Sequence, residues 1–320
     1  MVVRYGIIPA LRGRVVRWSV LLGLGVMLAG PAAASARTGR YAVGEIVVAY
    51  TDHSRFLHLP GHGRIPRTLV TVIRYPAVGD PSHVEVRGAP ADRAAGPFPL
   101  IVFAHGFDIT PGPYSALLDA WASAGYVVAA PIFPLTNPGA PGGPDEYDLV
   151  NQPGDVSYVI TRVLGAPHGI LAGLTDPRQV AVAGQSDGGS TALAAADDDA
   201  VRDPRIRAAV ILSGAEIPGL GDYFGEGGPP LLAVQGTADT SNAPRNTYHY
   251  YALAPSPKFL LRLWGAPHLG PYTDEQPYLG VVEHVSIAFL DRYLEHRPGA
   301  RQRMWSAGDV RGVASLSGGP

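Results

Sequence analysis

Short apolar stretches recur along the chain, and from its middle onward they alternate with longer stretches that have helical periodicity. The apolar, β-rich stretches predict eight strands, at 45–50, 68–75, 100–104, 126–132, 179–183, 208–212, 231–234 and 259–264. Helical periodicity predicts helices at 114–124, 156–164, 188–196, 243–253 and 281–294. Strands that alternate with helices indicate an α/β protein with a mostly parallel, eight-stranded sheet and helices on both faces. The first two strands have no helix between them, so we expect them to pair antiparallel at one edge.

The first 36 residues have the pattern of a secretory signal peptide. Four arginines precede an apolar segment at 19–29, and the small residues Ala34-Ser35-Ala36 follow it. We expect cleavage after Ala36 and an extracellular protein. We expect no stable membrane span after signal removal, because the apolar segment is too short to cross a bilayer. An uncleaved N-terminal anchor is the alternative.

After cleavage 284 residues remain, which suits one large domain with an ample core. We assign this domain to 37–296. The segment 297–320 is polar and glycine-rich, and we expect it to be a flexible C-terminal tail.

Charge and cysteine content narrow the function classes. The formal net charge is −2 and the sequence has no basic stripe, so nucleic acid is not an expected partner. The absence of cysteine excludes disulfides, thiolate catalysis and cysteine-ligated metals. An exported chain of this composition therefore depends on its core alone for stability.

The strongest local signal is the segment Gly184-Gln185-Ser186-Asp187-Gly188-Gly189, which follows a predicted strand and precedes a predicted helix. A G-x-S-x-G sequence in this context is typical of a serine nucleophile held on a sharp strand-to-helix turn. Such a turn strains the serine backbone, and only small residues two positions before and after it avoid a clash. The pentapeptide alone is weak evidence in a chain with 40 glycines, but the context favours Ser186 as a nucleophile.

A serine nucleophile needs a base, and the base needs an acid that orients it. His268 lies just after the last predicted strand, at the edge of the sheet where catalytic loops gather. Asp239 follows the strand at 231–234, which gives the chain order Ser186, Asp239, His268. Asp222 and Asp274 are the alternative acids.

Backbone N–H groups must stabilise the oxyanion that forms when an ester carbonyl is attacked. We expect one from Asp187, directly after the nucleophile, and one from Phe107, in the turn after the strand at 100–104. We also expect Phe107 to contact the substrate. His105 is either a second base or a residue that packs this turn, and its position before the turn favours packing.

With these motifs the chain resembles the α/β-hydrolase superfamily, in the branch of dienelactone hydrolases, platelet-activating-factor acetylhydrolases, chlorophyllases and cutinase-like polyester hydrolases. The resemblance covers about 44–294. It rests on AHGF at 104–107, GYVVAAPIFPLT at 125–136, NQPGDVSYVI at 151–160, GQSDGG at 184–189, QGTAD at 235–239 and GAPH at 265–268. It implies the α/β-hydrolase fold and a Ser-His-Asp triad, and it does not imply one substrate.

Two positions beside the nucleophile depart from the family pattern. Many relatives have His before the serine, where this chain has Gln185. Cutinase-like polyester hydrolases usually have Met after it, where this chain has Asp187. The segment 213–217 also lacks the Trp that those enzymes usually carry there. A carboxylate at Asp187 is expected to repel anionic substrates.

These observations predict a secreted serine hydrolase that cleaves carboxylic esters through an acyl-enzyme intermediate. We expect short- to medium-chain esters, because the sequence has no long apolar insertion of the kind that forms a lipase lid. The alternatives are a lipase or phospholipid-ester hydrolase, a polyester hydrolase, and a non-catalytic binding protein with this fold. The substrate is thus a small-molecule, lipid or polymer ester. We expect a monomer, with no cofactor and no metal.

Overall fold

Ten strands form one sheet in the computed structural model, which describes residues 40–319 except 60, 62 and 226. Their order across the sheet is β10-β9-β8-β7-β6-β4-β5-β2-β1-β3. The strands are β1 (Ala42–Leu57), β2 (Ile65–Ala77), β3 (Glu85–Arg87), β4 (Phe98–Ala104), β5 (Val127–Ile132), β6 (Thr175–Gln185), β7 (Ile206–Leu212), β8 (Leu231–Gly236), β9 (Lys258–Leu263) and β10 (Ala314–Gly319). The predicted signal peptide, at 1–36, lies outside the described residues.

The centre of the sheet is parallel, as the alternation of strands and helices predicts. Strands β5, β4, β6, β7, β8 and β9 run parallel to one another. The predicted antiparallel pairing of the first two strands is confirmed, because β1 pairs antiparallel with β2, and β2 in turn pairs antiparallel with β5. The prediction of eight strands is two too low, because β3 and β10 extend the two edges.

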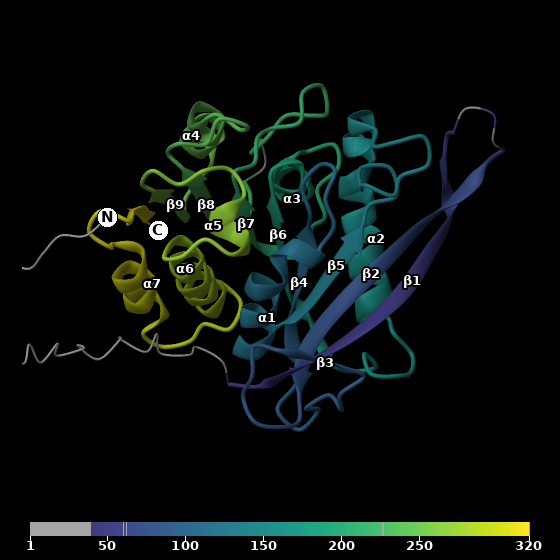
Figure 1. The fold of residues 1–320 in the computed structure, drawn as a ribbon, viewed down its shortest axis with the longest axis horizontal. Coiled ribbons are helices and arrows are strands. Elements are labelled where there is room, and N and C mark those ends of the chain that lie inside the picture. Colours follow the sequence, from purple (N-terminus) through teal and green to yellow (C-terminus); the bar gives the residue numbers. More distant parts are fainter. Residues whose placement is uncertain (1–39, 60, 62, 226, 320) are drawn as a thin grey trace, which may run out of the picture. The chain divides into compact units, whose positions relative to one another are not determined.

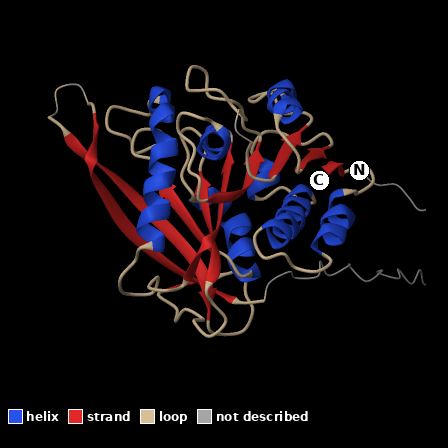
Figure 2. Cartoon of the chain, turned by 180° about the vertical axis from the view of Figure 1, so that it is seen from behind, coloured by secondary structure: helices blue, strands red, loops and turns tan. Residues whose placement is uncertain are grey.

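Helices cover both faces of the sheet, which confirms the predicted fold class (Figure 1). Helices α1, α6 and α7 pack on one face, and α2, α3 and α4 pack on the other, which Figure 2 shows from behind. The helical elements are η1 (Gly112–Tyr114), α1 (Ser115–Ala124), η2 (Glu146–Asn151), α2 (Gln152–Leu164), α3 (Asp187–Asp197), α4 (Pro244–Leu253), α5 (Gly270–Thr273), α6 (Tyr278–Tyr293) and α7 (Ala300–Gly308).

Side chains of the central strands alternate between two hydrophobic cores. On β4, Ile101 and Phe103 belong to the core under α1 and α6, and Leu100 and Val102 belong to the core under α2 and α3. All residues of β4 are buried, which is why its sequence is a continuous apolar run rather than an alternating one. Of the helices in the part of the chain that the structure describes, none has the length and apolarity needed to cross a membrane.

The prediction of a flexible tail at 297–320 is wrong for the residues described there. Helix α7 packs on the same core as α6 through Met304, and β10 pairs antiparallel with β9. Leu316 of β10 is buried in that core as well. The few apolar residues of this polar segment are therefore sufficient, because β9 offers backbone hydrogen bonds along an otherwise open edge.

The pair β1–β2 forms a long hairpin, here called the arm, that extends past the helices toward the upper right of Figure 1. The arm is tied to η2 and α2 by a buried guanidinium. Arg67 of β2 donates hydrogen bonds to both carboxylate oxygens of Asp148, at 2.9 and 2.6 Å, and of Asp155, at 2.7 and 2.6 Å. A bidentate Arg–carboxylate pair fixes direction as well as distance, so the arm holds η2 in place.

Candidate active site

The turn that carries Ser186 is strained in the way the sequence predicts. Ser186 lies between β6 and α3 with φ 58° and ψ −125°, a backbone conformation that non-glycine residues rarely adopt. A Cβ atom on Gly184 would overlap the carbonyl group of Gly188, and one on Gly188 would overlap that of Ala104. Both glycines are therefore required for β6, α3 and β4 to approach one another this closely.

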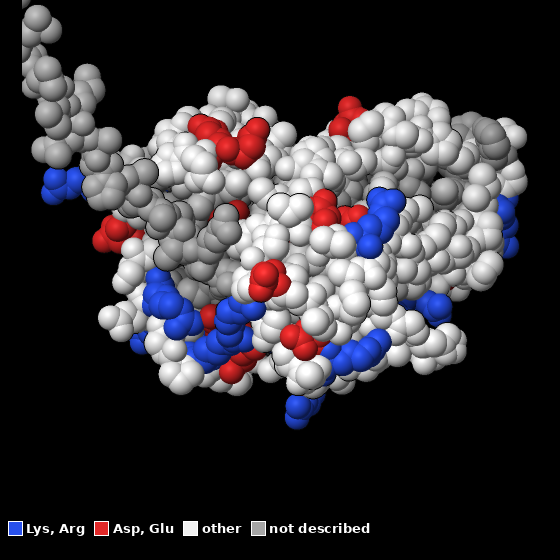
Figure 3. All heavy atoms as spheres, turned by 60° about the horizontal axis from the view of Figure 1, so that its bottom comes forward, with Lys and Arg blue, Asp and Glu red and all other residues white. Residues whose placement is uncertain are grey.

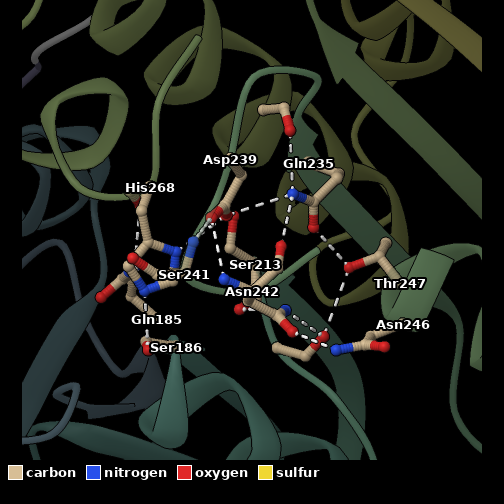
Figure 4. Close-up of polar contacts among 12 residues, drawn as sticks. Gln185, Ser186, Ser213, Gln235, Asp239, Ser241, Asn242, Asn246, Thr247 and His268 are labelled. Carbon is tan, nitrogen blue, oxygen red and sulfur yellow. Dashed lines mark hydrogen bonds and ion pairs between the residues drawn. The ribbon is translucent and has the colours of Figure 1, made fainter. Parts of the chain in front are cut away.

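His268 lies between Ser186 and Asp239, as Figure 4 shows. Its Nε2 atom is 2.8 Å from the hydroxyl oxygen of Ser186, and its Nδ1 atom is 2.8 Å from Oδ2 of Asp239. The three residues follow β6, β8 and β9, and the carboxyl ends of these parallel strands bring them to the same edge of the sheet. A proton can thus pass from the serine to a base whose other nitrogen is held by a carboxylate.

Asp239 is held as an anion by several donors. Its Oδ1 atom accepts hydrogen bonds from the backbone N–H groups of Ser241 and Asn242, at 3.0 and 2.9 Å. Its Oδ2 atom accepts one from the side-chain amide of Gln235, at 3.2 Å. Burial raises the pKa of Asp239, but the hydrogen bonds from His268 and Asn242 outweigh burial and hold that pKa below its ordinary value. The carboxylate is thus charged and able to stabilise an imidazolium.

The two alternative acids are placed differently. The backbone carbonyl of Asp222 accepts a hydrogen bond from Asp199, beyond the C-terminal end of α3. Asp274 is exposed after α5, and its carboxylate accepts a hydrogen bond from the hydroxyl of Thr273. The structure brings Asp239, and neither of these, to His268.

The turn after β4 passes directly beside Ser186. A Cβ atom on Gly106 would lie 3.2 Å from Cβ of Ser186, which places the next residue, Phe107, at the edge of the site. The backbone N–H of the following residue, Asp108, donates to the carbonyl of Thr136 and fixes the turn. Phe107 is 39% exposed, so this residue is accessible to a substrate. On the other side of Ser186, Asp187 is the first residue of α3, where a backbone N–H has no intrahelical acceptor.

His105 packs the turn rather than facing Ser186. Its Nδ1 atom bonds the carbonyl of Gly106 at 2.8 Å, and its Nε2 atom accepts the backbone N–H of Phe133 at 3.0 Å. Burial lowers the pKa of His105 to about 4, so the ring is neutral at ordinary pH. His105 therefore joins the loops after β4 and β5.

Sequence reasoning missed a role for Gln185. Its side-chain amide donates to the backbone carbonyl of His268 at 2.9 Å, and its side-chain oxygen accepts the hydroxyl of Tyr114 at 2.7 Å. Gln185 thereby connects the loop that carries the base to η1 and the turn beside it. Its departure from the family pattern is the one signal in the sequence that points to it.

Two hydrogen bonds of Gln152 connect α2 to α3 and to the loop after β5. The side-chain amide of Gln152, at the start of α2, donates to the hydroxyl of Thr136 at 2.9 Å and accepts the hydroxyl of Thr191 at 2.6 Å. All three side chains are buried. Because Arg67 holds the same part of α2, the arm is connected through this chain of contacts to the helix that follows Ser186.

The remaining polar side chains bear on two other kinds of site, a metal centre and a nucleic-acid interface. They contain no cluster of three or more His, Cys, Asp or Glu side chains that could hold a metal ion. Figure 3 shows one face of the molecule, where basic and acidic side chains lie among one another. That face has no basic stripe of the kind that binds nucleic acid.

Comparisons with known proteins bear on the fold and on the class of reaction. A model of the chlorophyllase family matches residues 63–213, a segment that includes Ser186 but neither Asp239 nor His268. Among solved structures, the ferulic acid esterase from Streptomyces cinnamoneus is similar, with a TM-score of 0.65 and 23% sequence identity over 84% of this chain and 93% of that chain. A sequence comparison with curated proteins finds no match. The fold is thus that of the α/β-hydrolases, and the family match supports a hydrolase that acts on carboxylic esters.

Proposed function

We propose that this chain, a carboxylic ester hydrolase of the α/β-hydrolase superfamily, is a secreted serine esterase that works through Ser186, His268 and Asp239. The observation that carries the proposal is the pair of 2.8 Å contacts that His268 makes with Ser186 and Asp239. The strained backbone of Ser186 adds support, because such strain is typical of a nucleophile on a strand-to-helix turn.

In the first half of the reaction, the hydroxyl oxygen of Ser186 attacks the ester carbonyl while Nε2 of His268 takes its proton. The ionised Asp239 stabilises the imidazolium through Nδ1. The backbone N–H groups of Phe107 and Asp187 stabilise the oxyanion. The tetrahedral intermediate then loses the alcohol, which takes the proton from His268, and the acyl group stays on Ser186.

In the second half, water replaces the alcohol. His268 takes a proton from the attacking water, and a second oxyanion forms at the same N–H groups. Its collapse releases the acid and restores the hydroxyl of Ser186. The scheme uses no group from outside the chain except water.

We propose short- to medium-chain esters as substrates, with lipid esters and polyesters as the alternatives. The support is the absence, from the sequence, of a long apolar insertion that could cover the site. We also propose that the protein is exported after cleavage behind Ala36 and acts as a monomer. N-terminal sequencing of exported protein would then start at Arg37, and light scattering would give the mass of one chain.

A series of para-nitrophenyl esters, from acetate to palmitate, tests the proposal on the purified protein and on Ser186→Ala. We expect turnover of the shorter esters and a loss on the order of 10³-fold or more in the variant. A fluorophosphonate should label the wild-type serine only. A long-chain optimum would favour a lipase. Full activity in Ser186→Ala would disprove the mechanism, and no turnover together with no labelling would favour a non-catalytic binding protein.

A further inference from the structure

The side chain of Asp187 belongs to the residue next to Ser186, at the start of α3. Its Oδ2 atom is buried and, among the described residues, has no hydrogen-bond partner. A buried carboxylate without a donor destabilises a folded protein, so a residue that only needed to donate its backbone N–H would be expected to be apolar or small. A local violation of this kind is expected at a functional site.

A second acidic residue lies on an element that packs against α3. Glu146 begins η2, which packs against α3, and its charge acts on Asp187. Burial, and after it the charge of Glu146, raises the pKa of Asp187 to about 6, although the charge of His268 lowers it. At pH 8 Asp187 is therefore ionised, and its negative charge lies on the residue next to Ser186.

The element that carries Glu146 is held in place by contacts of Asp148. Asp148, two residues further along η2, accepts two hydrogen bonds from the buried Arg67. The side chain of Asn151 also donates to Asp148, at 2.9 Å. The arm thus holds η2, the element that carries Glu146, beside α3.

Negative charge at this place opposes the proposed reaction of a neutral or anionic ester. The oxyanion forms at the backbone N–H of Asp187, so the carboxylate of the same residue raises the energy of the transition state. A positive charge on the substrate would reverse the sign of this effect, because its attraction to the carboxylate would lower the energy of the transition state.

We propose that Asp187, together with Glu146, selects esters that carry an ammonium group within a few bonds of the carbonyl, and disfavours anionic esters. This inference rests on the proposed esterase function and adds the substrate class. Asp187 makes the larger contribution, because it is half-buried and adjacent to the nucleophile. Glu146 is exposed, so its contribution is smaller and more sensitive to salt.

Matched esters test this at pH 8. In the acyl series, the probes are the para-nitrophenyl esters of trimethylammoniobutanoate, of its uncharged tert-butyl isostere, and of hydrogen glutarate. In the alcohol series, the probes are acetylcholine and its analogue with carbon in place of the quaternary nitrogen. The readout is the ratio of kcat/KM for the cationic ester to kcat/KM for its neutral isostere, compared between wild type and Asp187→Asn. Intrinsic reactivity of the esters cancels in this comparison.

We expect Asp187→Asn to lower that ratio about tenfold in at least one series and to raise the relative rate of the anionic ester. Glu146→Gln should lower it less, and high salt should weaken its effect more than that of Asp187→Asn. The control is Asp309→Asn, which removes one negative charge at an exposed position at the end of α7 and should leave the ratio unchanged.

Failure of the inference differs from failure of the esterase proposal. If wild type hydrolyses the neutral esters but Asp187→Asn leaves the ratio unchanged in both series, the charge of Asp187 does not select substrates and the inference is wrong. If wild type hydrolyses no ester and no serine is labelled by a fluorophosphonate, the esterase proposal itself fails. A ratio that falls equally in Asp309→Asn would also overturn the inference, because net charge alone would explain it.

Discussion

Two carboxylates, those of Asp239 and Asp187, act on the imidazole of His268, and their surroundings differ. Asp239, after β8, accepts hydrogen bonds from two backbone N–H groups, from Gln235 and from the imidazole, and its pKa is lowered. Asp187, at the start of α3, has a buried oxygen without a partner among the described residues, and its pKa is raised to about 6. Burial raises the pKa in both cases, so the donors make the difference.

The different number of hydrogen-bond donors shows how one site can hold two carboxylates in different states. The loop after β8 supplies donors inside the protein, so Asp239 stays charged whatever occupies the site. The turn before α3 supplies none to the buried oxygen of Asp187, so its charge depends on pH and on what binds next to it. In the proposed mechanism Asp239 orients the base, and in the proposed selection of substrates the charge of Asp187 is left for a cationic ester to neutralise.

The largest effect on kcat is expected from removing the charge of Asp239. Asp239→Asn keeps the shape of the side chain but disturbs the tautomer of His268, and in serine-hydrolase triads this change lowers kcat about 10⁴-fold. Asp274→Asn is the matched control and should leave kcat unchanged, since Asp274 is exposed and does not bind His268. A similar, small loss in both variants would mean that Asp239 does not orient the base.

A smaller loss of kcat is expected from removing the hydrogen bond that positions the loop of His268. Gln185→Leu removes the amide that donates to the carbonyl of His268, and it removes the acceptor of the Tyr114 hydroxyl. A displacement of the imidazole by about 1 Å is expected to cost about 10²-fold in kcat, with a smaller change in KM. Steady-state kinetics at saturating ester measure this split. An increase in KM with kcat unchanged would show that Gln185 contributes to binding instead.

The smallest effect concerns stability and comes from the second carboxylate. The pKa of Asp187 is higher in the folded protein than its ordinary value of 3.8, so protonation stabilises the fold. That stabilisation is present below about pH 4 and is lost as the pH rises through about 6. Because Asn cannot ionise, Asp187→Asn should be more stable than wild type by about 1–2 kcal/mol at pH 8, after allowance for partial exposure.

Urea unfolding at pH 8 and at pH 4 checks this prediction, because the difference between the two proteins should nearly vanish at the lower pH. Asp309→Asn again serves as the control, with no pH-dependent gain. Equal stability of wild type and Asp187→Asn at both pH values would mean that the side chain of Asp187 is solvated, and the contrast with Asp239 would disappear.

The sequence predicts the elements whose apolar pattern is strong. The continuous apolar runs of β4, β6 and β7 mark buried parallel strands, and G-x-S-x-G between a strand and a helix marks the strained turn at Ser186. It does not predict β10, because Ala314–Gly319 is rich in Ser and Gly and forms a strand only where β9 offers an edge. It does not predict β3 either, since three residues carry no measurable pattern.

In the site, residues marked by local motifs can be predicted from the sequence, and contacts between distant elements cannot. Each residue of the proposed triad is marked by the short motif around it and by its place after a predicted strand. Together with the chain order Ser, Asp, His, these local signals predict Ser186, Asp239 and His268. The contact of Tyr114 with Gln185 joins residues 71 positions apart, and that of Arg67 with Asp155 joins residues 88 positions apart. Polar side chains on separate elements leave no periodic trace in a sequence, so such contacts come from tertiary packing alone.

The pairing of β10 with β9 has a consequence for shortening the chain. β10 covers β9 from Lys258 to Leu263, the full length of that strand. Removal of 297–320 would leave a row of free backbone N–H and C=O groups on an apolar strand, which is a template for pairing with other molecules. A chain trimmed at 296 is therefore expected to aggregate through this edge, even though every residue of the triad is still present.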